Sequence, residues 1–155
     1  MTVARGGREA GVLRVIVLAD DLIWATRLVG QLRTLGVDPV RVGSADAFAT
    51  ALAAPVPAGP EGVRPTHVVV DLTARAYDGL AAVRFAAGAG LRVLCVGQHD
   101  DGAQRRAALA AGAERVFAYR KLFEDGHATL AAWLGVPAPA AGSLTAPQSS
   151  EVPAR

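Results

Sequence analysis

VVVDL, at residues 68–72, is the stretch that decides the fold class. Four of its five side chains are apolar, and an acid stands in the fourth place. A nearly continuous apolar run of this length is typical of a strand that is buried on both faces of a parallel sheet. Two other runs have the same character, VLRVIVLA at 12–19 and RVLCV at 92–96. We therefore expect a sheet whose central strands are covered on both sides.

Helical patterns separate the apolar runs. Leu28, Leu32 and Leu35 recur near helical spacing, and Gly36 follows as a C-terminal stop. Ser44 is placed to cap the next helix. The pattern predicts strands at 12–19, 40–42, 68–72, 92–96 and 116–119, and helices at 22–35, 45–54, 78–87, 103–111 and 122–134. Strands that alternate with helices form parallel sheets through right-handed crossovers, so the expected fold class is α/β, with a doubly wound sheet.

Composition limits the function classes. The chain has 155 residues, 52% of them hydrophobic, which favours one globular domain with a substantial core. The formal net charge of +2 is too small to argue for nucleic acid or an anionic membrane as a partner. Cys95 is the single cysteine, so no disulfide can form within the chain, and its apolar surroundings favour a buried thiol. A reducing, cytoplasmic location fits this cysteine usage.

The composition also suggests domain boundaries. Residues 1–11 are polar, lack the apolar core of a signal peptide, and are expected to be flexible. Residues 12–135 carry the alternating pattern, interrupted by a Pro/Gly-rich loop at 55–65. Residues 136–155 are rich in Ala, Pro and Ser and are expected to form a disordered tail.

Acidic residues follow two of the predicted strands. Asp20 and Asp21 come directly after the first strand, and Asp71 ends the third. Ligands of open α/β sheets bind at the carboxyl ends of the strands, where these acids converge. Three close carboxylates repel one another and call for a hard divalent cation such as Mg²⁺, and a carboxylate can also attack a phosphoryl group. The alternative is structural, because acids at strand ends are common and Asp20 or Asp21 could cap the first helix.

Four segments, in order along the chain, resemble those of one known family. They are LADD at 18–21, DLTARAYDGLAAVR at 71–84, VLCVGQHDD at 93–101 and AALAAGA at 107–113. Each is similar to the corresponding segment of response-regulator receiver domains, the CheY-like family of two-component and phosphorelay signalling. The resemblance covers roughly residues 12–135. It implies a flavodoxin-like, five-stranded parallel sheet in the order 2-1-3-4-5.

The resemblance also implies roles for individual residues. Asp71 occupies the position of the phospho-acceptor. Asp20 belongs to the acidic pair that binds Mg²⁺ together with the acceptor, and its partner is Asp21 or Ala19, depending on the register. Val116 and Phe117 fall where receivers often carry a switch aromatic on the fifth strand. Mg²⁺ is the one cofactor that the resemblance suggests.

Two positions depart from the family pattern. Receivers usually have Ser or Thr at the end of the fourth strand, where this chain has Gly97. They usually have lysine at the end of the fifth strand, where this chain has Tyr119, with Arg120 and Lys121 following. Tyrosine supplies no cation at neutral pH. The parts that hold and sense a phosphoryl group are therefore degenerate, which suggests an atypical or pseudo-receiver.

Three functions follow. The first is a stand-alone receiver-like module that signals through protein–protein contacts, with a histidine kinase or a downstream signalling protein as partner and a homodimer as an open alternative. The second is a conventional single-domain response regulator that accepts phosphate on Asp71. The third is a flavodoxin-like ligand binder or small enzyme, which is disfavoured because no phosphate-binding loop follows the first strand. No enzymatic activity is expected beyond self-phosphorylation from a phosphodonor.

Overall fold

A computed structural model describes residues 12–53 and 64–139. The predicted flexible N-terminus at 1–11, most of the 55–65 loop and most of the 136–155 tail lie outside the described residues. No helix in the two described ranges is long and apolar enough to cross a membrane.

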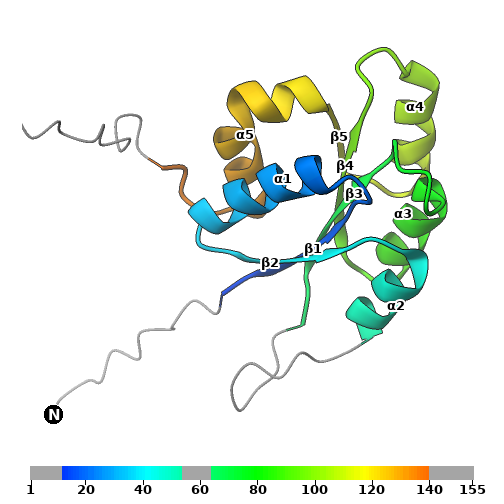
Figure 1. Ribbon diagram of the computed structural model, residues 1–155, viewed down its shortest axis with the longest axis horizontal. Coiled ribbons are helices and arrows are strands. Elements are labelled where there is room, and N and C mark those ends of the chain that lie inside the picture. The colour runs from blue at the N-terminus through cyan, green and yellow to red at the C-terminus, as the bar shows by residue number, and fades with distance from the viewer. Residues whose placement is uncertain (1–11, 54–63, 140–155) are drawn as a thin grey trace, which may run out of the picture.

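Five parallel strands form one sheet in the order β2-β1-β3-β4-β5 within the described chain, which confirms the predicted fold (Figure 1). The strands are β1 (Arg14–Leu18), β2 (Asp38–Val42), β3 (His67–Asp71), β4 (Arg92–Gly97) and β5 (Arg115–Ala118). The helices are α1 (Leu22–Thr34), α2 (Ala45–Ala53), α3 (Gly79–Gly88), α4 (Gly102–Ala111) and α5 (Tyr119–Leu134).

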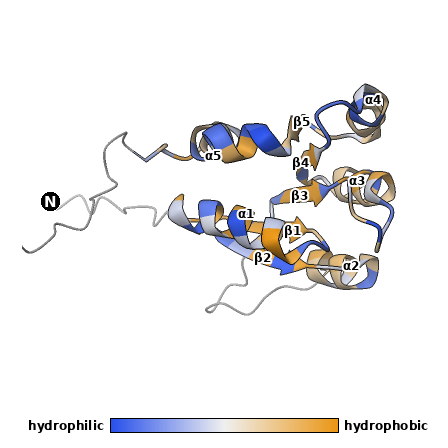
Figure 2. Cartoon of the chain, turned by 45° about the horizontal axis from the view of Figure 1, so that its top comes forward, coloured by the Kyte–Doolittle hydropathy of each residue, from blue (hydrophilic) through white to orange (hydrophobic). Residues whose placement is uncertain are grey.

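The helices cover both faces of the sheet. Helices α1 and α5 lie on one face, and α2, α3 and α4 lie on the other (Figures 1 and 2). Side chains of β1 alternate between the two layers. Ile16 and Leu18 pack in the core under α2–α4, whereas Val15 and Val17 pack under α1 and α5. This arrangement explains why the central strands read as continuous apolar runs.

The predicted helix ends are found where the turn chemistry placed them. Ser44 Oγ accepts the backbone N–H of Ala47 at 3.2 Å and caps α2. Gly36 follows α1 with a φ of 78°, and Gly112 ends α4 with a φ of 117°. A Cβ at Gly112 would lie only 2.6 Å from the Cβ of Ala87, so backbone conformation and space both require glycine there.

The largest error in the predicted boundaries lies at the junction of β5 and α5. Strand β5 ends at Ala118, and Tyr119 already begins α5, three residues before the predicted helix start at Leu122. Two ion pairs at i,i+4 spacing support this added turn. Arg120 pairs with Glu124, and Lys121 pairs with Asp125. The helix then departs from helical geometry at Asp125, where φ is −144°.

The packed chain continues one residue past the expected boundary at residue 135. The N–H of Val136 donates to the carbonyl oxygen of Ala131, and the Val136 side chain is half-buried against the core under α1 and α5. Residues 137–139 are exposed. Val136, the first residue of the predicted tail, therefore belongs to the packed domain.

Candidate functional site

The acids meet at the carboxyl edge of the sheet because β1 and β3 are neighbours. Leu18 pairs with Val70 in the parallel register, so Asp20 and Asp71 leave the sheet at the same edge. The hydroxyl oxygen of Tyr77 lies 2.9 Å from the carbonyl oxygen of Leu18 and 2.8 Å from that of Asp71. Burial raises the pKa of Tyr77 well above its ordinary value, and the charges of Asp71 and Asp20 add to the effect. The Tyr77 phenol therefore ties the two strand ends together.

Asp71 is held inside the protein at the end of β3. It is only 4% exposed, and its Oδ1 accepts the backbone N–H of Thr73 at 2.8 Å and the Thr73 hydroxyl at 2.7 Å. Its Oδ2 is buried and has no hydrogen-bond partner among the described residues. One carboxylate oxygen is thus hydrogen-bonded to Thr73, and the other is available to accept a hydrogen bond or to bind a ligand.

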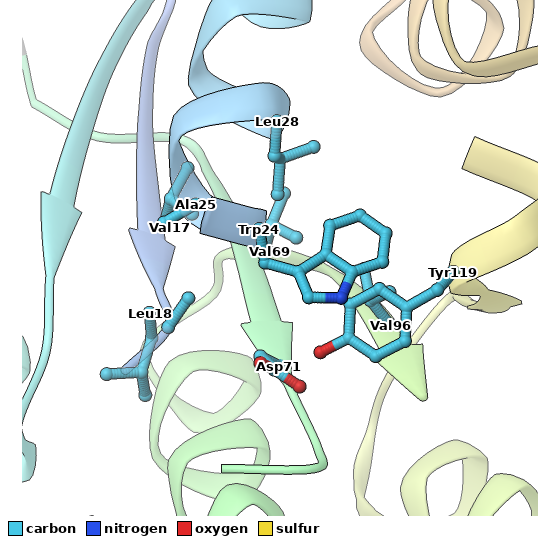
Figure 3. A pocket seen from close by; sticks show the side chains of 10 residues that line it. Val17, Leu18, Trp24, Ala25, Leu28, Val69, Asp71, Val96 and Tyr119 are labelled. Carbon is cyan, nitrogen blue, oxygen red and sulfur yellow. The ribbon is translucent and has the colours of Figure 1, made fainter. Parts of the chain in front are cut away.

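Tyr119 reaches the same carboxylate from the start of α5. Its hydroxyl lies 2.9 Å from Thr73 Oγ1, and Figure 3 shows it directed toward Asp71. Thr73 has a single hydroxyl hydrogen, which it donates to Asp71, so Tyr119 is the donor to Thr73 in this arrangement. Burial raises the pKa of Tyr119 far above its ordinary value, and the nearby Asp71 carboxylate raises it further. Tyr119 therefore supplies a neutral hydroxyl at this position.

The basic residues that follow Tyr119 turn away from the site. Arg120 Nε lies 2.7 Å from Glu124 Oε1, and Lys121 Nζ lies 3.3 Å from Asp125 Oδ2, all at the surface. Within the described residues, Asp71 takes part in no salt bridge. Both cations therefore pair with acids on their own helix and not with the acids at the sheet edge.

Asp20 and Asp21 have different environments. Asp21 is exposed and caps α1, because its Oδ1 accepts the N–H groups of Ile23 at 2.9 Å and Trp24 at 3.1 Å. Asp20 instead faces the loop after β3, where its Oδ2 accepts the N–H groups of residues 75 and 76 at 3.0 and 3.2 Å. Asp21 thus has the structural role that was the alternative to metal binding.

The predicted set of three metal-binding carboxylates, Asp20, Asp21 and Asp71, is not assembled. In the described parts of the chain, no three His, Cys, Asp or Glu side chains are grouped as a metal site. The buried, unpartnered Oδ2 of Asp71 nevertheless fits a cation that prefers oxygen ligands. Each of the three acids uses a single oxygen in its hydrogen bonds within the described residues, and a Mg²⁺ ion at this edge would rest first on Asp71 and Asp20.

An aromatic stack fixes the position of Tyr119. The ring of Trp24, on α1, lies 3.5 Å from the Tyr119 ring and 4.2 Å from the Phe123 ring, measured between centroids. The Arg27 guanidinium lies 4.4 Å from the Phe123 centroid, a cation–π contact. Trp24 and Tyr119 line a small apolar hollow next to Asp71 (Figure 3). Trp24 therefore packs directly against Tyr119, the residue that stands in place of lysine.

The remaining predicted positions lie on β4 and β5. Gly97 is buried at the end of β4 and carries no polar side chain. Val116 is 6% exposed in the core under α2–α4, and Phe117 is half-buried against the opposite core. Sequence reasoning missed Thr73, and it missed Gln104, whose Nε2 donates to the carbonyl oxygen of Leu72 at 3.0 Å. The spacing of Asp71 and Thr73 could have signalled the first, since an acid commonly accepts the N–H two residues further on.

Solved structures of known proteins resemble this chain. A response regulator receiver protein from Burkholderia phymatum is similar at 30% sequence identity, covering 83% of this chain and 99% of that chain, with a TM-score of 0.68. A response regulator protein from Burkholderia pseudomallei, with a phosphorylated aspartic acid, calcium ion and citrate, is similar at 21% identity, 78% and 66% coverage, and a TM-score of 0.62. The Mn²⁺-bound form of response regulator Rcp1 is similar at 15% identity, 83% and 99% coverage, and a TM-score of 0.64. No family model and no curated protein matches the sequence.

The sheet order and the acids at its carboxyl edge define a receiver-type α/β domain. The similarity to the Burkholderia phymatum protein, at 30% identity over 99% of that chain, identifies the family. The chain belongs to the response regulator receiver family of two-component signalling. The two structures below 25% identity support the fold alone.

Proposed function

We propose that this protein is an atypical receiver that signals through protein–protein contacts and does not depend on phosphorylation of Asp71. One observation carries the proposal. The Asp71 carboxylate accepts a hydrogen bond from Thr73, which is hydrogen-bonded to Tyr119, and Asp71 forms no salt bridge within the described residues. The position from which a lysine would reach the acceptor is filled by a neutral phenol.

The energetics support this proposal. A phosphoryl group on Asp71 would carry a charge of about −1.5 to −2 at neutral pH, in place of the single negative charge of the carboxylate. Its neighbours would be the hydroxyl groups of Thr73 and Tyr119, which donate neutral hydrogen bonds. Each missing charge-assisted contact removes about 1.5–3 kcal/mol. Two such losses, at the lysine position and at Gly97, are comparable with the few kcal/mol that separate the two states of a switch.

The conventional response regulator remains the second candidate, and one observation favours it. Asp71 retains an unpartnered oxygen, and Asp20 brings a second carboxylate to the same edge. A Mg²⁺ ion held by these two acids would neutralise charge on a phosphoryl group. Because the Asp71 side chain is 4% exposed, the Thr73 and Tyr119 hydroxyls would have to move before a phosphodonor could approach.

Exposed apolar side chains beside the site support a protein partner. Leu22 and Ile23, at the start of α1, are 63% and 78% exposed, and Phe123 on α5 is 44% exposed. Helices α1 and α5 contact each other, so these residues lie on adjoining elements. Exposed apolar groups with a charged rim are typical of interaction sites. We infer that a histidine kinase or a downstream signalling protein docks here.

Incubation with a small phosphodonor and Mg²⁺, followed by intact-mass measurement, tests the proposal. We expect little or no gain of a phosphoryl group, because the acceptor is buried and no basic side chain pairs with it to stabilise the product. Asp71→Asn is the matched control for modification elsewhere. A stoichiometric gain in the wild type that is absent from Asp71→Asn would favour the conventional response regulator.

A further inference from the structure

Gly97 is constrained by its neighbours and not by its own backbone. Its φ is not among the positive values found at glycines such as Gly112. A Cβ built on Gly97 would lie 3.1 Å from Oε1 of Gln104 and 3.8 Å from Cδ1 of Leu72. The first distance is shorter than an ordinary van der Waals contact. The Gln104 side chain thus occupies the space that a side chain at residue 97 would need.

Gln104 connects α4 to the acceptor strand. Its Nε2 donates to the carbonyl oxygen of Leu72 at 3.0 Å, and Leu72 is the residue directly after Asp71. Only the amide nitrogen can donate to a carbonyl, which leaves Oε1 facing Gly97. One half-buried side chain on α4 therefore contacts the ends of both β3 and β4.

The first turn of α4 is arranged to hold this side chain. Asp101 caps the helix by accepting the N–H of Gln104 at 2.8 Å. In a reciprocal capping box, the glutamine would reach back to the N–H of the capping residue. That N–H instead points to the carbonyl oxygen of Gln98, at 3.5 Å, so the carboxamide is free to reach Leu72. The next residue, Arg105, donates to the Val116 carbonyl oxygen at 2.9 Å and ties α4 to β5 as well.

We propose that Gln104 is a positioning residue that holds the first turn of α4 against the end of β3, in the space that Gly97 leaves open. This Gln104 bridge, from Gln104 Nε2 to Leu72 O across Gly97, sets the position of α4 beside β5. The glycine at residue 97 and the glutamine at residue 104 then depend on each other, because the small residue leaves room for the long side chain. Any side chain at residue 97 would place its Cβ 3.1 Å from Gln104 Oε1, so the Gln104 carboxamide would have to shift.

The bridge explains how α4 keeps one position without a phosphoryl group, and it thereby deepens the proposed function. The consequence of the bridge for signalling rests on that proposed function. Its structural content is independent of phosphorylation. A thermodynamic cycle in the absence of phosphodonor therefore tests the bridge even if Asp71 proves to be a working acceptor.

The experiment compares four full-length proteins: wild type, Gly97→Ala, Gln104→Ala and the double variant. The readouts are urea unfolding and hydrogen–deuterium exchange of residues 102–111. Loss of one net hydrogen bond in Gln104→Ala predicts exchange in α4 about fivefold faster. Gly97→Ala should lower the urea midpoint in the wild-type background by displacing Gln104. In the Gln104→Ala background it should leave the midpoint unchanged or raise it, since alanine restricts the unfolded chain.

Two controls separate the bridge from simpler effects. Gly30→Ala, where an added Cβ meets nothing within 4 Å, should have the same effect in both backgrounds. Gln104→Glu keeps the side-chain size but removes the donor, so its α4 exchange should resemble that of Gln104→Ala. Equal effects of Gly97→Ala in both backgrounds, or wild-type exchange in Gln104→Glu, would overturn the proposal.

Discussion

The phenol oxygen of Tyr119 lies 2.9 Å from the hydroxyl oxygen of Thr73, and this contact joins the start of α5 to the loop that follows the acceptor strand. Thr73 passes the contact to Asp71 through a 2.7 Å hydrogen bond. A chain of neutral donors therefore ends on a buried carboxylate, at the position where the resemblance to receivers implies a lysine.

Removal of the phenol hydroxyl should weaken the fold without disturbing the aromatic stack. Tyr119→Phe leaves the ring beside Trp24 but removes the donor to Thr73. We expect the free energy of unfolding to fall by about 1 kcal/mol, the net value of one hydrogen bond. Urea unfolding measures this difference. The losses of unfolding free energy in Thr73→Val and in Tyr119→Phe should not add up to the loss in the double variant. Strictly additive losses would mean that the two hydroxyls act separately.

A cation introduced at residue 119 should increase the phosphorylation of Asp71. Tyr119→Lys places an ammonium group near Asp71, where it can neutralise part of the charge of a phosphoryl product. We expect this variant to gain more phosphoryl group from a small phosphodonor and Mg²⁺ than the wild type does, as judged by intact mass. The double variant with Asp71→Asn controls for modification elsewhere. A Tyr119→Lys protein that stays as unreactive as the wild type would show that burial of Asp71, and not the missing cation, is the barrier.

His67 should make the free energy of unfolding depend on pH. It lies at the start of β3, at the end of the strand opposite Asp71. It is 5% exposed, with Nδ1 2.7 Å from Thr66 Oγ1 and its ring edge-on to Trp133. Burial lowers the pKa of His67 below its ordinary value of 6.5, and the Arg92 charge lowers it further. Below about pH 6.5 the unfolded chain therefore binds a proton that the folded chain resists, and the free energy of unfolding falls as the pH falls.

The control for this pH effect uses two histidine variants. His67→Gln should reduce the slope of unfolding free energy between pH 7 and about pH 5.5, whereas replacement of the exposed His127 by Asn should leave it close to wild type. Urea unfolding at several pH values gives both slopes. An unchanged slope in His67→Gln would assign the effect to other groups.

The fold could be predicted from sequence because its signals are local. The apolar runs of β1, β3 and β4 are continuous since both faces are buried, and Gly36 and Gly112 mark helix ends through their own backbone needs. The β5–α5 junction was predicted less well because no turn residue separates Ala118 from Tyr119. The strand and the helix meet there directly, so the sequence contains no turn-forming residue that marks the boundary.

The site was predictable only in part. Asp20 and Asp71 were found because strand ends and motif spacing are visible in sequence. The Tyr119–Thr73 contact spans 46 residues, and the Gln104–Leu72 contact spans 32, so neither leaves a local pattern. The helix-capping role of Asp21 was among the alternatives, but the choice between cap and metal ligand depends on side-chain direction, which composition does not encode.

The most direct test of the central claim is hydrogen–deuterium exchange of α4 and β5, residues 102–118, in the full-length protein with and without a small phosphodonor and Mg²⁺. Intact mass on the same samples gives the phosphorylated fraction, and Asp71→Asn controls for effects of the donor itself. We predict that exchange of this segment in the wild type stays unchanged on addition of the donor, whatever the fraction phosphorylated. A change of about tenfold or more in the wild type, equivalent to about 1.4 kcal/mol and absent from Asp71→Asn, would contradict the account and restore a phosphorylation-driven switch.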